Sequence, residues 1–227
     1  MLLRRGDGVL VPLDIRRWRE PAGGGDLGVL RRCTGSVLDV GCGPGRIVRA
    51  LASSGRNAMG IDVCPSAVAH TISWGAHAVV RSVFEHVPRE GAWATALLLD
   101  GNVGIGGDVA GLLRRVASIV RPGGLLLAEA APDDVDERHL VQVVDALGRS
   151  APFTWASAGA AALARHGRST GWTPTEEWTS AGRVFLALRR TAAGGAAPAR
   201  PSAARPPGPR AAVSWTCPWP PGAVRAT

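Results

Sequence analysis

A glycine-rich loop with a carboxylate at its entrance is the segment of this chain best suited to chemistry. In "VLDVGCGPGR" (residues 37–46), Gly41, Gly43 and Gly45 follow a short apolar run, and Asp39 stands just before them. Glycines let the backbone approach a ligand closely and adopt positive φ angles. A carboxylate beside the loop disfavours a pyrophosphate, whereas it attracts an ammonium or a sulfonium. The pattern therefore indicates a binding loop for a ligand that carries positive charge.

A dinucleotide loop is the competing interpretation of this segment. Nicotinamide-dependent reductases use the fingerprint Gly-x-Gly-x-x-Gly between a strand and a helix. Here Arg46 occupies the position of the third fingerprint glycine, where a large side chain hinders close packing of the helix on the strand. The NAD(P)-dependent reductase is kept as an alternative.

The motif "LDVGCGPGR" resembles the first motif of class I S-adenosylmethionine-dependent methyltransferases, and the resemblance extends from about Ser36 to Arg190. It implies that the three glycines approach the amino-acid end and the ribose of the cofactor S-adenosylmethionine. It implies further that Asp39 organises the loop and the methionine end. By the same resemblance, Asp62 accepts charge-assisted bonds from the ribose hydroxyls, and Val63 lies against the adenine.

The segment "RSVFEHVP" (residues 81–88) departs from the family pattern. The family commonly has an acid near its start that bonds the adenine amino group, and Ser82 stands in that place here. The resemblance also implies that Val83 presents its backbone N–H to the adenine ring. A hydroxyl makes a weaker bond than a carboxylate. We therefore expect weak cofactor binding unless Glu85 substitutes for the missing acid.

A second glycine-rich segment, "LLLDGNVGIGGD" (residues 97–108), follows the fourth predicted strand. Ligands of such sheets bind beyond the carboxyl ends of the strands, and by the resemblance Asp100, Gly101 and Asn102 border the methionine part of the cofactor and the acceptor. In this hypothesis Asn102 orients the acceptor, Asp100 accepts its proton, and the later glycines allow close approach of the substrate. The segment has no lysine and no nearby arginine to bind a phosphate. The alternative is that Asp-Gly-Asn forms an ordinary turn.

No residue is assigned as catalytic, because methyl transfer from an activated donor depends mainly on positioning and on exclusion of water. Glu129, at the end of the fifth predicted strand, is a candidate for the acceptor pocket, and His86 is the best placed histidine. His139 and His166 fall on predicted helices. The chain lacks the Asn-Pro-Pro-aromatic motif of amino-directed nucleic-acid and protein methyltransferases, which disfavours a nucleobase acceptor.

Alternating strands and helices must position these residues. Short apolar runs predict strands at 36–40, 58–62, 77–82, 95–100 and 125–130. Apolar spacing and caps predict helices at 26–33, 46–54, 65–74, 108–120, from Asp133 or Asp134 to about 147, and 157–166. The segments 172–178 and 183–190 predict an antiparallel hairpin. The expected fold is α/β and Rossmann-like: a doubly wound, mostly parallel seven-stranded sheet with an antiparallel C-terminal hairpin strand and helices on both faces.

Composition and charge divide the chain of 227 residues into three predicted parts. Residues 1–24 are expected to be a lead-in, 25–190 the methyltransferase domain, and 191–227 a disordered Ala/Pro/Arg-rich tail. The formal net charge is +8, but there is no lysine, which excludes Schiff-base chemistry and a Walker-type phosphate lysine. The arginines of the tail leave a nucleic-acid methyltransferase or binder as a second alternative.

The remaining expectations concern partners and location. The cysteines form no Cys-x-x-Cys pair and have no histidine cluster near them, so no metal site is expected. No secretory signal or membrane-spanning run is present, and a cytoplasmic location is expected. The predicted partner is a small-molecule methyl acceptor whose identity the sequence does not determine, and the oligomeric state is equally undetermined.

Overall fold

The computed structural model of the protein describes residues 1–145 and 148–191, and its main element is a seven-stranded sheet. The strand order is β11-β12-β7-β6-β3-β4-β5. The strands are β3 (Val37–Val40), β4 (Ala58–Asp62), β5 (Ala78–Val80), β6 (Trp93–Leu98), β7 (Val120–Ala130), β11 (Trp172–Ser180) and β12 (Arg183–Arg190). Strands β3 to β7 pair in parallel, and the hairpin of β11 and β12 continues the sheet antiparallel to β7. The predicted fold class is confirmed.

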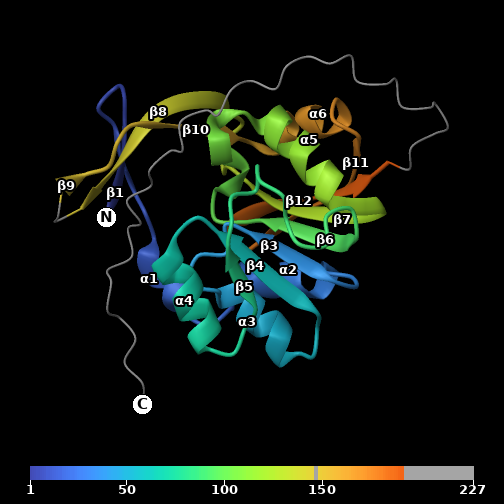
Figure 1. Ribbon diagram of the computed structural model, residues 1–227. Helices are drawn as coiled ribbons and strands as arrows, with labels where there is room; N and C mark the ends of the chain where they lie inside the picture. Colours follow the sequence, from blue (N-terminus) through green and yellow to red (C-terminus); the bar gives the residue numbers. More distant parts are fainter. Residues whose placement is uncertain (146–147, 192–227) are drawn as a thin grey trace.

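Helices cover both faces of this sheet (Figure 1). They are α2 (Gly25–Arg32), α3 (Arg46–Ser53), α4 (Pro65–Ser73), α5 (Val109–Ile119) and α6 (Ala160–Arg168). On β3, Val37 packs into the core that contains α2 and α3, whereas Leu38 packs into the core that contains α5 and α6. Successive strand residues point to opposite faces, so a strand covered on both sides reads as a continuous apolar run.

Local sequence signals set two helix starts as predicted. Pro65 is the first residue of α4, a position where its missing N–H has no helical partner to lose. The Asp108 side chain caps α5 by accepting a hydrogen bond from the N–H of Gly111. These helices therefore begin where the sequence predicts.

A second, antiparallel sheet lies beside the main body, at the upper left of Figure 1. Its strands are β1 (Leu2–Arg5), β2 (Leu10–Pro12), β8 (Asp136–Asp145), β9 (Gly148–Arg149) and β10 (Phe153–Ala158). Their order is β10-β8-β1-β2, with β9 paired to β8. Two of these strands fall within residues 1–24, where the sequence predicts only a lead-in.

The helix predicted from Asp133 or Asp134 to about 147 is wrong, because β8 occupies most of that range. Val141 and Val143 lie on one face of β8 and are buried with Phe153 of β10. Alternating β-branched residues suit a half-buried strand. The pairing partner β1 is distant in sequence, and β10 pairs with β8 only after the chain reverses direction, so a pattern of adjacent residues does not reveal them.

Two short elements connect the sheets to the rest of the chain. Helix α1 (Ile15–Arg19) links β2 to α2, and the 3₁₀ segment η1 (Asn102–Gly107) links β6 to α5 and packs against β10. None of the helices in the described residues is long and apolar enough to cross a membrane. The predicted disordered tail, apart from Thr191, lies outside the described residues.

Candidate functional site

The three segments singled out in the sequence meet at the carboxyl edge of the main sheet. β3 lies between β4 and β6, so the loop after β3, Asp62 at the end of β4 and the Asp100 turn after β6 are neighbours. The N–H of Gly43 donates to Asp62 Oδ2 at 2.8 Å. Asn102 Nδ2 donates to the carbonyl of Val40 at 2.8 Å and to that of Gly41 at 2.9 Å. Hydrogen bonds therefore join all three segments into one unit.

The three glycines of the first loop differ in what surrounds them. All have positive φ angles. A Cβ at Gly41 would lie 2.6 Å from Asn102 Nδ2, and one at Gly45 would lie 2.4 Å from Thr71 Oγ1. A Cβ at Gly43 would meet nothing within 4 Å. Packing thus accounts for Gly41 and Gly45, whereas the space beside Gly43 is open to a ligand.

Asp39 is a buried acid without a local partner. Its residue is 4 % exposed. Burial raises the pKa of Asp39 to about 7, although the charge of Arg46 opposes this. Within the described residues no hydrogen bond reaches its carboxylate. Burying a carboxylate in this way is costly unless a cation or donor pairs with it, so Asp39 is well suited to a positively charged ligand group.

Asp62 accepts backbone hydrogen bonds at both carboxylate oxygens. Oδ2 accepts from Gly43, and Oδ1 accepts from the N–H of Cys64 at 2.8 Å. Burial raises the pKa of Asp62, while these backbone hydrogen bonds oppose the rise. A carboxylate oxygen has a second lone pair, so both oxygens keep the capacity to accept a bond from a ligand hydroxyl.

The Asp100 turn differs from the sequence prediction that no arginine is near. Arg17 Nη2 lies 2.6 Å and Arg183 Nη2 lies 3.1 Å from Asp100 Oδ1, and Arg46 Nη2 contacts Oδ2. These arginines come from α1, β12 and α3, which only the tertiary fold brings together. Burial raises the pKa of Asp100, while the charges of Arg46, Arg17 and Arg183 oppose the rise. The carboxylate is engaged in structural ion pairs, and its predicted role as proton acceptor stays a prediction.

Two further acids complete a buried charge network around Asp100. Asp26 pairs with Arg46 and with Arg183, and Glu129 accepts two bonds from Arg183. Glu129 Oε2 also accepts the N–H of Asp100 at 2.6 Å. Although burial opposes ionisation, Arg46 and Arg183 hold the pKa of Asp26 below its usual value. Glu129, predicted to line the acceptor pocket, is therefore engaged inside the protein.

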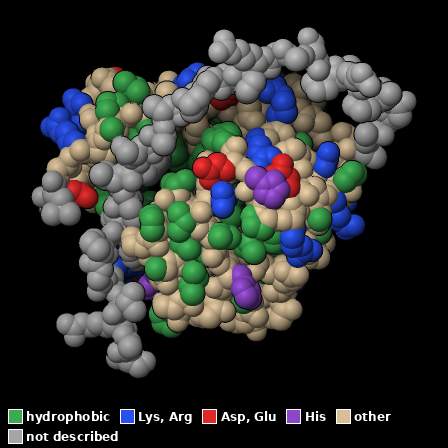
Figure 2. Space-filling view, viewed as in Figure 1, with side chains coloured by type: hydrophobic (Ala, Val, Ile, Leu, Met, Phe, Trp, Pro, Cys, Tyr) green, Lys and Arg blue, Asp and Glu red, His purple; other side chains and the backbone are tan. Residues whose placement is uncertain are grey.

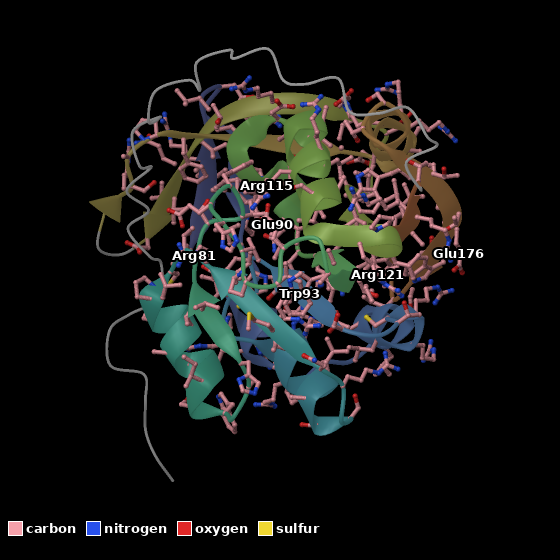
Figure 3. The ribbon with its side chains drawn as sticks, turned by 45° about the vertical axis from the view of Figure 1, so that its right-hand side comes forward. Arg81, Glu90, Trp93, Arg115, Arg121 and Glu176 are labelled. Atoms are coloured by element: carbon pink, nitrogen blue, oxygen red, sulfur yellow. The ribbon has the colours of Figure 1, made fainter. Side chains whose placement is uncertain are left out.

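The segment from Ser82 to Glu90 is held by an arginine that sequence reasoning missed. Arg115 of α5 donates to the carbonyl of Val83 at 2.8 Å and to that of Glu85 at 2.6 Å. It also pairs with Glu90, and this bond lowers the pKa of Glu90 to about 2 (Figure 3). Figure 2 shows charged side chains of both signs and a histidine near the middle of the face it draws.

Within this segment Ser82 forms a local turn. Its Oγ accepts the N–H of Phe84 at 3.3 Å, and its N–H donates to Glu85 Oε2 at 3.2 Å. Val83 is buried, whereas Val63, which follows β4, is exposed. The predicted adenine contacts of Val63, Ser82 and Val83 stay predictions.

Gly104, Gly106 and Gly107 of the second segment face protein atoms, whereas a Cβ at Gly101 would meet nothing within 4 Å. A Cβ at Gly104 would lie 2.4 Å from Trp155 Nε1, and one at Gly107 would lie 2.6 Å from Thr154 Cβ. Thr154 Oγ1 also donates to the carbonyl of Gly106 at 3.1 Å. Close packing of η1 on β10 accounts for Gly104 and Gly107, so no substrate is needed to explain them.

His139 and His166 pair with acids of the second sheet. His139 lies on strand β8 rather than on the predicted helix, and its Nε2 contacts Glu137 Oε2 at 2.8 Å. His166 lies on α6 as predicted, beside Asp136. Among residues 1–145 and 148–191, no group of three or more His, Cys, Asp or Glu side chains is arranged to hold a metal ion.

Comparisons with known proteins agree with this geometry. A family model described as "Methyltransferase domain" matches residues 19–168. The chain belongs to the methyltransferase domain family. No curated protein matches its sequence. The family and the fold confirm the predicted class I S-adenosylmethionine-dependent methyltransferase.

Three solved structures illustrate the fold of this methyltransferase. A SAM-dependent methyltransferase from Bacteroides fragilis, in complex with S-adenosylhomocysteine, is 22% identical with a TM-score of 0.66, over 84% of this chain and 88% of that one. A 1,6-didemethyltoxoflavin-N1-methyltransferase from Burkholderia thailandensis is 19% identical (TM-score 0.55; 74% and 76% covered). An amino pentose methyltransferase from Micromonospora echinaspora is 16% identical (TM-score 0.55; 78% and 94% covered).

Proposed function

We propose that this methyltransferase binds S-adenosylmethionine along the carboxyl edge of β3, β4 and β6 and methylates a small-molecule acceptor. Asp39 carries the proposal, because its buried carboxylate lacks a hydrogen-bond partner in the described residues and stands near the end of β3, just before the glycine loop that contains the open position Gly43. The ammonium group of a methionine moiety is a suitable partner for such a carboxylate. When bound, the cofactor supplies a methyl group already activated by a positively charged sulfur.

The residues of the chain then bind and orient the cofactor. In this proposal Asp62 accepts the ribose hydroxyls through its remaining lone pairs. The adenine lies against Val63 and the turn formed by Ser82 and Val83. Gly101 and Asn102 border the methionine part, and Asp100 contributes the shape of the turn rather than a base. Positioning by these groups is the main chemical work that transfer from an activated donor requires.

A small acceptor is favoured by two observations. Solved structures with this fold include proteins described as methyltransferases of a toxoflavin precursor and of an amino pentose. The second sheet packs against η1, which directly follows the Asp100 turn, so it is placed to shape an acceptor site. A nucleic-acid acceptor would depend on the arginines of the tail, which lies outside the described residues. We further propose residues 25–190 as the methyltransferase domain, and a cytoplasmic location stays a prediction.

Calorimetry and a transfer assay test the proposal on the full chain. We expect S-adenosylhomocysteine to bind and NADPH not to bind. Asp62→Ala should weaken S-adenosylhomocysteine binding by about 1.5–3 kcal/mol, the typical value of a charge-assisted hydrogen bond. With radiolabelled cofactor, label should pass to members of a panel of amino sugars and fused nitrogen heterocycles, but not to RNA or DNA oligonucleotides. NADPH binding without S-adenosylhomocysteine binding, or label on oligonucleotides alone, would contradict it.

A further inference from the structure

The charge network under the Asp100 turn is balanced only when Arg17 is counted. Its most buried members are the acids Asp26, Asp100 and Glu129 and the arginines Arg46 and Arg183. Without another cation this group carries one excess negative charge. Arg17 supplies the missing positive charge through its 2.6 Å contact with Asp100, and its side chain is 32% exposed. The last member of the network therefore approaches from the solvent side.

The position of the Asp100 carboxylate is linked to the cofactor loop through the backbone. Asp100 has a left-handed φ of 54°, which is uncommon for a residue other than glycine, and Gly101 follows with a φ of 84°. This turn places Asn102 so that its Nδ2 bonds the carbonyls of Val40 and Gly41. Ion pairs that hold Asp100 thus also hold the loop beside Gly43.

Arg17 belongs to a part of the chain that the family model does not cover. The model begins at residue 19, and Arg17 lies on α1. Before α1, strand β1 pairs with β8 of the second sheet, and β2 pairs with β1. The N-terminal segment therefore spans from the second sheet to the Asp100 turn, and Arg17 is its contact with that turn.

From these contacts we infer that Arg17 is a positioning residue for the cofactor site, and that the N-terminal segment supports this site through Arg17. The inference rests on the proposed cofactor edge. Arg17 neutralises Asp100, the Asp100 turn holds Asn102, and Asn102 holds the cofactor loop. Because coupling between two sites is reciprocal, cofactor binding also strengthens the docking of α1.

The test compares two neighbouring arginines of α1 on the full chain. Arg17→Gln removes the contact with Asp100. Arg16→Gln is the matched control, because the Arg16 side chain is 91% exposed and pairs with Glu20 on the same helix. By calorimetry, we expect Arg17→Gln to weaken S-adenosylhomocysteine binding about tenfold, within the usual range of coupling between sites. Arg16→Gln should bind like the wild type, and Arg17→Lys should recover part of the loss.

A second readout separates positioning from general destabilisation. Hydrogen exchange should show that S-adenosylhomocysteine protects residues 15–19 in the wild type and in Arg16→Gln, but not in Arg17→Gln. Equal affinity and equal protection in Arg17→Gln would overturn the inference and leave the proposed function intact. Absence of binding to the wild type would instead overturn the proposed function. If Arg17→Gln does not fold, the S-adenosylhomocysteine affinities of the wild type and Arg17→Lys are compared instead. Equal affinities that do not change between about 0.05 and 0.5 M salt would overturn the inference.

Discussion

The two glycine-rich loops of this methyltransferase look alike in sequence and differ in their surroundings. Each follows a strand of the parallel sheet, precedes a helix and has an acid at its start. Beside Gly43 the space is open and the Asp39 carboxylate has no partner among the described residues. Around Gly104 and Gly107 the space is filled by β10, and Asp100 is covered by three arginines. Two loops with similar glycine content therefore differ in packing and in whether their acid is paired, and these differences favour the first loop as the proposed ligand loop.

The largest expected effect is a loss of stability when Arg46, the partner of Asp26 and Asp100, is replaced. Arg46→Met should lower the free energy of unfolding by about 3–5 kcal/mol, the usual cost of breaking a buried ion pair. The Arg46 side chain is 4% exposed and contacts both Asp26 and Asp100. Urea denaturation measures the change. Arg49→Met on the same helix is the control, since Arg49 stacks on the exposed Trp74 ring, and an equal loss in both variants would contradict the buried network.

Replacing the unpaired acid Asp39 should weaken ligand binding rather than lower stability. Asp39→Asn should leave the fold intact and weaken S-adenosylhomocysteine binding by about 1.5–3 kcal/mol, because a charge-assisted contact is lost. Calorimetry and thermal unfolding on the same sample measure both quantities. A variant that binds normally would remove Asp39 from the proposed cofactor site.

The pH dependence sharpens the same contrast. Burial raises the pKa of Asp39 from its ordinary value of 3.8 to about 7 in the folded protein. A raised pKa means that the folded state binds the proton more tightly, so this contribution to stability is present at low pH and is lost as pH rises through about 7. S-adenosylhomocysteine affinity should change in the opposite sense and fall below pH 7. Asp39→Asn should lose both dependences, and their persistence would assign them to another group.

Alanine at one glycine of each loop tests the comparison directly. Gly43→Ala should lower the free energy of unfolding by about 1–2 kcal/mol, because alanine is strained in a left-handed backbone. It should also weaken S-adenosylhomocysteine binding, because the new Cβ enters the open space beside the loop. Gly107→Ala should lower the free energy of unfolding by more, because overpacking against Thr154 (about 1–3 kcal/mol) adds to the same left-handed backbone penalty at a φ of 70°. It should change the affinity of the folded fraction little. Reversed results would exchange the roles of the two loops.

The smallest effect concerns the adenine end. Ser82→Asp restores the acid that the family commonly has, and it should tighten S-adenosylhomocysteine binding by less than about 1.5 kcal/mol if it accepts a bond from the adenine amino group. Glu85→Gln is the matched control, since Glu85 accepts the N–H of Ser82 in the present turn. Unchanged affinity in Ser82→Asp would place position 82 away from the adenine.

Local pattern was sufficient for the parallel sheet and for several helix boundaries. Continuous apolar runs between turn residues predict buried strands, and Pro65 and Asp108 predict helix starts that the structure confirms. The same reasoning failed at β8, because the partners that make it a strand lie on β1 and β10. Strand pairing is a non-local interaction, so its stabilisation does not appear in a window of adjacent residues.

The sequence by itself determined the family motif, the parallel strands with the helices between them, and the glycine loop with Asp39 and Asp62. These depend on residue type and spacing over short distances, where backbone conformation and burial pattern are encoded. Only the tertiary structure decided the partners of Asp100 and the neighbours of Gly104 and Gly107. Arg17, Arg46 and Arg183 are between 54 and 83 residues away from Asp100 along the chain. Long-range electrostatic contacts of this kind exist only once the elements that bring them together have packed.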